Sequence, residues 1–537
     1  RKTLMNETIS VSRTKLPFFS KEDLDFIYNQ ESISEFIGLP FGTQQLKNQI
    51  NLKQKHFNQG LRETLVGSLK ENYKTISENK TALEQIELLR DKNTFTVTTG
   101  HQLCLYGGPL YFFIKILHTI RLAEELKKSN PEKNFIPVFW MASEDHDSEE
   151  IESLTLFGKT LTWDHGQKGA VGKFDTKAID AVRKELLALF RTDENSKLAN
   201  SLNALEGKNY GDAFRNWVHF LFGSKGLLVL DADQTALKKE MIPAFERELR
   251  TSFSNQCIQK TNEALKAADR KRQIHSREIN LFYMHEDVRT RILIEGDRYM
   301  VANTSYSRGE IIELLHLFPE RFSPNVALRP LYQESILPNL CYIGGMAELR
   351  YWSQLKGIFL SSEVPFPMLQ MRTNLLWIDQ SAFKNSMKLG LTPTDLLKPM
   401  KDLQKKVIAK EDPNPIDKEK VTKALTLLSD TYKNAIKNDL GLQAWLGSEL
   451  KKIEKNQAAI ESKIEKSKKT SFDGKIKKLT NLKERLFPDQ KLQERTQNLL
   501  HFCNSKGIDE RINELYNAID PLSNDFTVLI EKENDSK

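Results

Sequence analysis

A segment that follows the first β-branched run contains residue types that bind phosphate groups. The run at residues 94–99 predicts a strand, and helix formers without a breaker occupy residues 110–128. Glycines let a ligand approach the backbone closely, and helix N-termini attract anions. The glycine spacing matches neither the dinucleotide fingerprint nor a P-loop, so a tight turn is the alternative interpretation. We expect a nucleotide or phosphate to be bound by Gly100, His101, Gln102, Gly107 and Gly108.

A single charged residue stands in the helix-forming stretch. Lys115 is the only formally charged residue between His101 and Arg121, and most of its neighbours are apolar. A buried lysine needs an anionic partner, or its side chain must extend to solvent. We expect Lys115 to bind the same phosphate, and a lysine that merely extends to solvent is the alternative.

An acidic cluster with one histidine follows the most apolar run, residues 135–142. Ligands of open α/β sheets bind beyond the carboxyl ends of the strands, and residues 143–147 are expected there. Adjacent carboxylates can hold a histidine tautomer, orient an amine or ligate a hard cation such as Mg²⁺. The alternative is that these acids only stabilise a helix N-terminus, which would not require a histidine. We expect catalysis by Asp145, His146 and Asp147, and substrate binding by Glu144.

A third group of candidate residues surrounds a short apolar run at residues 340–343. A planar guanidinium can bind a carboxylate through two hydrogen bonds, and a Gly–Gly pair after a strand suits an anion. Aromatic residues that simply pack in the core are the alternative for part of this group. We expect substrate to be bound by Asn325, Arg329, Gly344, Gly345, Glu348, Tyr351 and Trp352.

The elements that would position these residues follow an α/β pattern. Continuous apolar runs predict strands that are buried on both faces of a parallel sheet. Helix-forming segments separate the runs, as in a doubly wound fold. Two insertions interrupt the pattern, and the second contains short β-like runs that predict an antiparallel meander. The five core runs lie at residues 94–99, 135–142, 226–230, 340–343 and 366–371.

The C-terminal third has the periodicity of a coiled coil. Apolar residues and one glutamine recur at alternating spacings of four and three from Leu446 to Ile464. If residues 416–469 form one helix, it cannot bury this stripe alone. We therefore expect a turn at residues 470–474 into a returning helix at residues 476–486. The resulting antiparallel hairpin is also expected to mediate homodimerisation.

Composition excludes several classes of protein. Of the 537 residues, 39% are hydrophobic and 28% are charged, which is typical of a folded globular protein. The apolar runs are much shorter than the roughly 18 residues that a membrane span needs. Four scattered cysteines predict neither a disulfide framework nor a four-thiolate zinc site. With no signal-peptide pattern at the first residues, we expect a cytoplasmic protein without a membrane partner.

The net charge of +7 is concentrated in one region. Residues 451–485 contain 12 Lys and Arg against 5 Asp and Glu. A lysine-rich helix can bind nucleic acid, but it is more often a solvated face, so nucleic acid is not expected as the partner. A coiled-coil protein that associates with nucleic acid, or a scaffold with a nucleotide-binding core, is the alternative function.

The order of these motifs resembles that of the bacillithiol biosynthesis cysteine-adding enzymes, the BshC family. The resemblance covers nearly the whole chain, and its most specific part is Trp-Met-Ala-Ser-Glu-Asp-His-Asp at residues 140–147. His101 stands where the family more often has glutamine. The resemblance implies a Rossmann-like core related to nucleotidyl transferases and class I aminoacyl-tRNA synthetases, with connecting-peptide insertions and a dimerising coiled coil.

The domain boundaries expected on this basis divide the core into three parts. The N-terminal helical segment and the first half of the core occupy residues 1–150. The core continues at residues 226–269 and 326–382. Insertions occupy residues 151–225 and 270–325, and the helical coiled-coil domain occupies residues 383–537.

The resemblance also implies a reaction, the formation of an amide between the carboxyl of L-cysteine and the amine of glucosaminyl-malate. A carboxylate is a poor electrophile, so we expect ATP as a co-substrate, together with Mg²⁺, and no tightly bound cofactor. Asp145, His146 and Asp147 would position the amine and accept its proton. Arg329 would bind a carboxylate, such as that of the malate.

Overall fold

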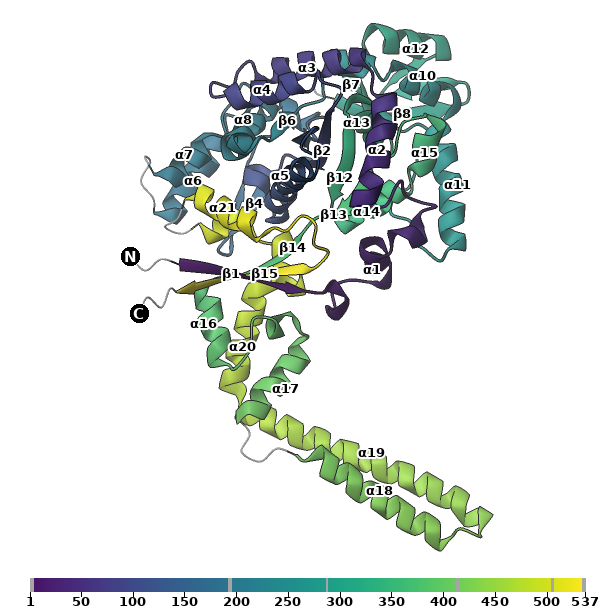
Figure 1. The fold of residues 1–537 in the computed structure, drawn as a ribbon, viewed down its shortest axis with the longest axis vertical. Coiled ribbons are helices and arrows are strands. Elements are labelled where there is room, and N and C mark those ends of the chain that lie inside the picture. The colour runs from purple at the N-terminus through teal and green to yellow at the C-terminus, as the bar shows by residue number, and fades with distance from the viewer. Residues whose placement is uncertain (1–3, 192–195, 286–287, 412–415, 504–506, 534–537) are drawn as a thin grey trace. The chain divides into compact units, whose positions relative to one another are not determined.

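The computed structural model describes residues 4–191, 196–285, 288–411, 416–503 and 507–533, and these divide into two compact units (Figure 1). The core unit comprises Ser10–Leu376 and Gln493–Thr527. The arm unit comprises the described residues among 1–9, 377–492 and 528–537. Residues 493–527, at the end of the expected coiled-coil domain, make their contacts in the core unit. The domain boundaries expected from the sequence stay predictions.

A five-stranded parallel sheet forms the centre of the core unit, in the order β13-β12-β2-β3-β6. Each of the five apolar runs forms one of these strands, so the predicted sheet is confirmed. In β2 every residue except His101 is buried, which explains why the run is continuous rather than alternating. The strands are β2 (Thr94–His101), β3 (Asn134–Met141), β6 (Leu228–Leu230), β12 (Asn339–Gly344) and β13 (Met368–Met371).

Helices surround this sheet in the core unit, and the predicted helix at residues 110–128 is found one residue later. Their bounds are α1 (Lys21–Tyr28), α2 (Thr43–His56), α3 (Gln59–Tyr73), α4 (Lys80–Leu88), α5 (Tyr111–Ser129), α6 (Ile179–Phe190), α7 (Lys197–Asn203), α8 (Tyr210–Phe222), α9 (Thr235–Lys239), α10 (Ile242–Thr251), α11 (Phe253–Ala267), α12 (Arg308–Leu317), α13 (Arg329–Ile336), α14 (Met346–Ser353), α15 (Lys356–Ser361) and α21 (Ile508–Ala518).

Hydrophobic clusters lie on both faces of the sheet. One cluster combines Ile50 of α2 and Leu122 of α5 with Phe95 of β2. The other combines helices α3, α4, α10, α13 and α14 with side chains of β3 such as Val138 and Trp140. Helices on both faces define a doubly wound α/β layer, so the predicted fold class is confirmed.

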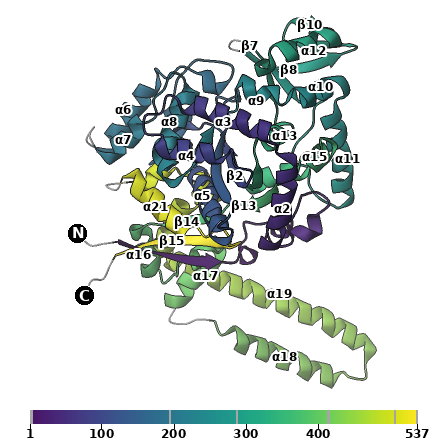
Figure 2. The same ribbon diagram turned by 45° about the horizontal axis from the view of Figure 1, so that its top comes forward.

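The two insertions contain small antiparallel sheets. The first begins with a hairpin of β4 (Ser153–Leu156) and β5 (Lys159–Thr162), followed by α6 to α8. The second forms a five-stranded sheet in the order β10-β9-β8-β7-β11, beside α12 (Figure 2), which confirms the predicted meander. Its strands are β7 (Leu281–His285), β8 (Val288–Glu295), β9 (Arg298–Val301), β10 (Thr304–Tyr306) and β11 (Phe322–Pro324).

The arm unit is mainly helical. A further sheet of three strands has the order β1-β15-β14. No helix in the described part of the chain is both long and apolar enough to cross a membrane. The helices of the arm unit are α16 (Gln380–Lys388), α17 (Met400–Glu411), α18 (Lys418–Ala435), α19 (Leu440–Ser471) and α20 (Asp473–Leu486), and the strands of the small sheet are β1 (Leu4–Val11), β14 (Asn374–Ile378) and β15 (Phe526–Glu533).

The helical hairpin is present, but the prediction placed its turn wrongly. Residues 416–469 do not form one helix, because the chain turns between α18 and α19 (Figures 1 and 2). Asp439 Oδ1 accepts hydrogen bonds from the backbone of Gly441 and Leu442, both at 3.0 Å, and so starts α19. The heptad isoleucines, including Ile453 and Ile460, line a groove with Val421 of α18.

The expected returning helix packs elsewhere in the arm unit. α20 begins just after residue 472 and contacts α17 and α16. Its buried residues include Ile476, Leu479 and Leu482. The lysine-rich segment lies on α19 and α20, where Lys452 forms an ion pair with Glu449 at 2.7 Å. Such local pairs on an exposed helix are typical of a solvated face.

Candidate functional site

A cavity of about 660 Å³ lies at the carboxyl edge of the central sheet. Its lining includes residues that end or follow β2, β3, β12 and β13. The strand order reverses between β2 and β12, and such a switch point leaves a crevice in which α/β proteins bind ligands. Twelve of the residues predicted for the site line the cavity: Gly100, His101, Gln102, Lys115, Glu144, Asp145, His146, Asn325, Arg329, Gly345, Glu348 and Tyr351.

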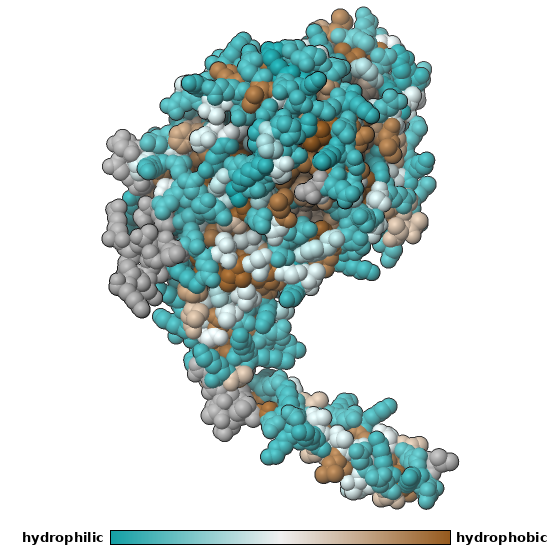
Figure 3. All heavy atoms as spheres, viewed as in Figure 1, coloured by the Kyte–Doolittle hydropathy of each residue, from teal (hydrophilic) through white to brown (hydrophobic). Residues whose placement is uncertain are grey.

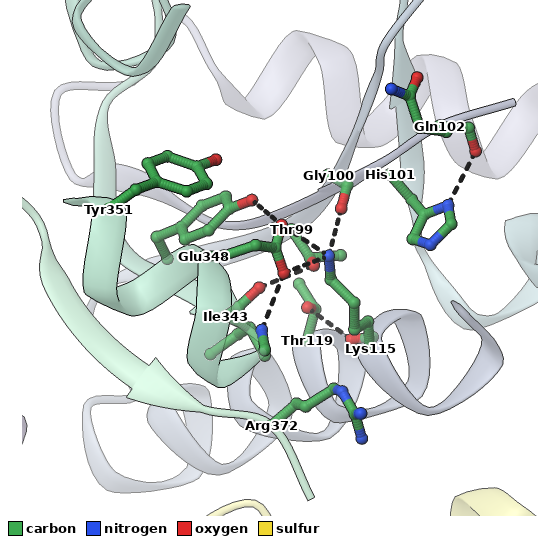
Figure 4. A network of polar contacts seen from close by, with 12 residues as sticks. Thr99, Gly100, His101, Gln102, Lys115, Thr119, Ile343, Glu348, Tyr351 and Arg372 are labelled. Carbon is green, nitrogen blue, oxygen red and sulfur yellow. Dashed lines mark hydrogen bonds and ion pairs between the residues drawn. The ribbon is translucent and has the colours of Figure 1, made fainter. Parts of the chain in front are cut away.

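Lys115 is buried beside the cavity and has a protein partner. Only 2% of its surface is exposed, and its Nζ donates to Glu348 Oε1 at 3.0 Å and Oε2 at 2.8 Å (Figure 4). It also donates to the carbonyl of Gly100. This ion pair joins α5 to α14 across the switch point. The sequence predicted the need for an anionic partner, but not that Glu348 would supply it.

Glu348 is the centre of this polar network. Its carboxylate also accepts hydrogen bonds from Tyr342 Oη at 3.0 Å and from the backbone N–H of Gly345 at 2.8 Å. Burial opposes its ionisation, but Lys115 and the Gly345 N–H hold the pKa of Glu348 below its ordinary value. Glu348 therefore caps α14 and remains a carboxylate, which fixes the geometry of the switch point.

Asp145 is held as a carboxylate by three neighbours. It accepts hydrogen bonds from the side chain of Gln102 and, at 2.7 Å, from the backbone N–H of His146. Arg289 Nη1 lies 3.6 Å from its Oδ1. Burial opposes ionisation, but the hydrogen bonds from His146 and Gln102 and the charge of Arg289 hold the pKa of Asp145 well below its ordinary value. Asp145 is consequently a weak proton acceptor.

The tautomer of His146 follows from its contact with Arg289. Arg289 Nη1 lies 2.9 Å from His146 Nδ1, and Asp145 Oδ1 lies 3.3 Å from the same nitrogen. A guanidinium has donors only, so in the shorter contact Nδ1 accepts, and an uncharged ring then carries its proton on Nε2. The guanidinium is fixed by the ring of Phe282, 4.0 Å away, and by Ser323 Oγ at 3.2 Å. His146 can therefore donate a hydrogen bond into the cavity, while the lone pair that a base needs is already used.

Two further acids line the cavity and differ in their surroundings. Glu144 forms an ion pair with the fully buried Lys238, which also pairs with Asp233 at 2.8 Å. Glu150 has no comparable cation, and partial burial together with Asp147 and Asp145 raises its pKa above the ordinary value. A carboxylate with a raised pKa is the better proton acceptor near neutral pH. Glu150 could not be selected from the sequence alone, because nothing there distinguishes it from the neighbouring acids.

The cavity also contains arginines without acidic partners. Arg329 Nη1 donates to Gln333 Oε1 at 2.9 Å and Nη2 donates to Tyr351 Oη at 3.2 Å, and both partners are neutral. Arg277 and Arg291, from the second insertion, also line it. Among the described residues, none of these three guanidinium groups forms an ion pair with a carboxylate. Only Arg329 was predicted, because the other two lie in a segment without a recognisable motif.

His101 is a neutral ring in this cavity. Its Nδ1 lies 2.9 Å from the carbonyl of Gln102 and 3.9 Å from Cys104 Sγ. Burial, followed by the charge of Lys115, lowers the pKa of His101 to about 4. Burial also raises the pKa of Cys104 to about 12, so this thiol is not an activated nucleophile.

Gly107 and Gly108 do not line the cavity, although they were predicted to bind phosphate. Both have positive φ angles, and a Cβ atom would lie 2.7 Å from Phe112 Cδ1 at Gly107 and 2.7 Å from Cys104 Cβ at Gly108. Asn498 donates hydrogen bonds to the carbonyls around this turn. The alternative interpretation, a tight turn, describes their position. The sequence could not show that Asn498, 392 residues after Tyr106, would supply hydrogen bonds to this turn.

Three other predicted residues also lie outside the cavity lining. Trp352 is fully buried and stacks on Tyr342, with ring centres 4.5 Å apart, as expected for core packing. Gly344 is buried, and its carbonyl accepts a hydrogen bond from the backbone of Arg372 at 3.0 Å. Asp147 is exposed just beyond the lining residues. The described residues contain no cluster of three His, Cys, Asp or Glu side chains suited to a metal ion.

Two family models match the chain and together cover nearly all of it. The model of the bacillithiol biosynthesis BshC N-terminal Rossmann-like domain matches residues 6–373. The chain belongs to the BshC family. The model of the BshC C-terminal coiled-coil domain matches residues 375–531. The family and the two-part architecture predicted from the sequence are confirmed.

Members of the BshC family with assigned names align over most of their length. A protein of Flavobacterium psychrophilum is 37% identical over 97% of this chain and 99% of its own. A protein of Flavobacterium johnsoniae is 36% identical over 95% of this chain and 97% of its own length. A protein of Bacillus cereus is 27% identical over 86% of this chain and 88% of its own length. Each carries the name "Putative cysteine ligase BshC". The expectation of a ligase agrees with these names.

Proposed function

We propose that this chain joins the carboxyl group of L-cysteine to the amine of glucosaminyl-malate, as a step of bacillithiol biosynthesis. One observation carries the proposal: the cavity combines acids that attract an amine with arginines that lack acidic partners. Such a combination suits an acceptor that has both an amino group and carboxylates. The names of the relatives support cysteine as the other substrate.

The malate part of the acceptor would be bound by the arginines. Arg329, Arg277 and Arg291 line the cavity and can each bind a carboxylate through two hydrogen bonds. Arg329 is oriented by Gln333 and Tyr351, so less conformational entropy is lost when it binds.

The amine would approach the acidic side of the cavity. Glu144 and Asp145 would attract and orient it, and Glu150 would accept its proton, because the pKa of Glu150 is raised by partial burial and by its acidic neighbours. His146 would donate from Nε2 to the oxygen that gains charge at the reacting carbonyl. These roles assign proton transfer to Glu150 in place of the originally expected Asp145, His146 and Asp147.

ATP would activate the carboxylate before the amine attacks. A carboxylate oxygen of cysteine forms a bond to the α-phosphorus, and the bond from that phosphorus to pyrophosphate breaks. The amine nitrogen then bonds to the carbonyl carbon, AMP leaves with the electron pair of the broken C–O bond, and the proton of the amine passes to Glu150. Magnesium would be needed only as the ion that accompanies the phosphates of ATP.

The test is product formation from defined components. Purified protein is incubated with cysteine, glucosaminyl-malate, ATP and Mg²⁺, each omitted in turn, and bacillithiol is measured by mass spectrometry. Product that requires every component supports the proposal. Protein that binds the substrates but forms no bacillithiol in the complete mixture would disprove it.

We also propose that the chain forms a homodimer through α18 and α19. Apolar side chains are exposed on this helix pair (Figure 3). The exposed fraction is 70% for Leu427, 59% for Trp445 and 61% for Ile460. Light scattering should give the mass of a dimer for the native chain and of a monomer for Leu427→Glu. The neighbouring Thr426→Glu is the control, and a monomeric native chain would contradict the proposal.

The expected location is the cytoplasm. All four cysteines, Cys104, Cys257, Cys341 and Cys503, have free thiols, as is usual for proteins of a reducing compartment. Fractionation of cells that produce the protein, with an antibody against it, tests this location, and recovery from an extracytoplasmic fraction would contradict it.

A further inference from the structure

The N-terminus of α14 offers unpaired hydrogen-bond donors at the switch point. The first N–H groups of an α-helix have no acceptor within the helix. In α14 these include the N–H groups of Met346 and Ala347, and among the described residues these two have no acceptor outside the helix. Ala347 and Gly345 line the cavity. By contrast, the N-terminal turn before α5, at Gly107 and Gly108, is closed by packing.

A buried arginine lies at the same corner, and one of its three side-chain nitrogens has no hydrogen-bond partner among the described residues. Arg372 directly follows β13, and only 2% of its surface is exposed. Its Nη1 donates to the carbonyl of Thr373 at 2.9 Å and its Nη2 donates to Glu494 Oε1 at 2.7 Å. Its Nε is buried and, within the described ranges, has no partner. Buried donors without an acceptor are unfavourable, so this atom indicates a missing ligand.

Glu494 holds the guanidinium of Arg372 in place, so that its Nε cannot turn toward another acceptor. The carboxylate of Glu494 is fully buried and also accepts hydrogen bonds from Asn374 Nδ2 at 2.7 Å and the Leu375 N–H at 2.8 Å. Because these bonds fix the carboxylate, they also fix the guanidinium. Glu494 is a positioning residue, and it comes from the segment that follows the arm unit in the sequence.

The space between Arg372 and α14 stays open because residue 345 is glycine. A Cβ atom at Gly345 would lie 3.9 Å from Arg372 Nε and 3.5 Å from Glu348 Oε2. Gly345 has φ of −80° and ψ of 162°, which any residue can adopt. Glycine at position 345 is therefore not needed for the backbone conformation, but it leaves room for a ligand to reach Arg372 Nε.

We propose that this corner binds a phosphate group of the nucleotide, which accepts hydrogen bonds from Arg372 Nε and the N–H of Ala347. Arg495, which also lines the cavity, adds positive charge, while the nearby carboxylate of Glu348 is neutralised by Lys115. The inference rests on the proposed function, because it requires ATP as the activating substrate. It places the phosphate at the helix that follows the fourth core strand and not at the predicted Gly107–Gly108 turn.

The sharpest test fills the open space without changing the fold. Gly345→Ala should weaken binding of ATP and of pyrophosphate about tenfold or more, measured by isothermal titration calorimetry on the whole protein. Gly67→Ala is the matched control, because Gly67 is an exposed residue of α3 with no atom near the added Cβ. Circular dichroism should show the same fold for both variants.

A second variant tests the positioning role of Glu494. Glu494→Gln keeps the shape but weakens the hold on Arg372, so the KM for ATP should rise while the KM for cysteine stays unchanged. A merely structural role would change both KM values or the melting temperature alone. An unchanged KM for ATP in a folded Glu494→Gln would contradict the positioning role.

The outcomes separate this inference from the proposed function. If Gly345→Ala binds ATP and pyrophosphate like the native chain, the phosphate subsite is disproved, although ligation can still occur. If Gly345→Ala instead weakens binding of cysteine or glucosaminyl-malate only, the corner binds a carboxylate and the inference is wrong. Failure of the proposed function would appear differently, as intact ATP binding without product in the native enzyme.

Discussion

Lys53 and Glu334 form an ion pair in the interior of the core unit, with 3.2 Å between Nζ and Oε2 and no exposed surface on either side chain. Glu334 Oε1 also accepts hydrogen bonds from Gln333 at 2.9 Å and Asn339 at 2.7 Å. Gln333 in turn accepts the hydrogen bond from Arg329. A continuous chain of polar contacts therefore runs from α2 to the cavity.

Removal of Lys53 should destabilise the fold strongly. Lys53→Met leaves the buried carboxylate of Glu334 without its cation, at an expected cost of about 3–5 kcal/mol in the free energy of unfolding. Urea unfolding at neutral pH measures the loss. Lys55→Met, at an exposed position of the same helix, should have almost no effect.

The cost of Lys53→Met should depend on pH. Burial raises the pKa of Glu334, and Lys53 is the main charge that opposes this shift. In the variant the folded-state pKa rises further above its unfolded value, so protonation stabilises the fold at low pH and this stability is lost as pH rises through the folded-state pKa. Unfolding measured at about pH 5 and about pH 8 should show the larger loss at the higher value. A loss independent of pH would contradict this account.

Arg329 should determine acceptor affinity more than turnover. Arg329→Lys keeps the charge but loses the planar pair of donors, so the KM for glucosaminyl-malate should rise about 10- to 100-fold with a smaller change in kcat. Tyr351→Phe removes only one acceptor of the guanidinium and should cause a smaller rise. If the KM for cysteine rises instead, Arg329 binds the other substrate.

Glu150 should control the acid limb of the pH–rate profile. Glu150→Gln should lower kcat/KM by about 10²–10⁴, and the exposed neighbour Glu149→Gln should change it little. A base is active only when deprotonated, so kcat/KM falls as pH drops through the raised pKa of Glu150. Asp147→Asn removes one of the charges that raise this pKa, and should move the acid limb to lower pH. An unmoved limb would exclude Glu150 as the titrating group.

His146 should be replaceable in part by a neutral donor. Because Arg289 donates to Nδ1, the ring acts through the N–H at Nε2, and the amide group of glutamine can place a donor near that position. We expect His146→Gln to retain clearly more activity than His146→Ala. Equal loss in both variants, with unchanged melting temperatures, would indicate that a proton acceptor has been removed.

The sheet and much of the cavity could be predicted because their signals are local. The run that ends in Trp140 and Met141 is apolar throughout since β3 is buried on both faces. The chemistry at the carboxyl ends then follows from the general rule for α/β sheets. For this reason His146 and Arg329 could be selected from the sequence alone.

Other parts of the site depend on contacts between distant segments. Arg289 lies on a strand of the second insertion, and only the fold brings it to His146, 143 residues away. Arg372 lies in a segment with no recognisable motif. What distinguishes it is the buried ion pair with Glu494, which the sequence could not show. Local signals can also be missed: Asp439 and Gly441 mark the start of α19, but the heptad pattern masked them.

The contact between Arg372 and Glu494 has a consequence for synthesis on the ribosome. The two residues are 122 positions apart, and the intervening chain includes the helices of the arm unit. At ordinary elongation rates, roughly 6 to 24 seconds pass after Arg372 is translated before Glu494 is added. During that interval the five-stranded sheet can form, but the guanidinium of Arg372, directly after β13, lacks its buried counter-ion Glu494. A nascent chain therefore lacks this buried ion pair until translation has passed the arm, and truncation before Glu494 should give a protein that folds poorly around Arg372.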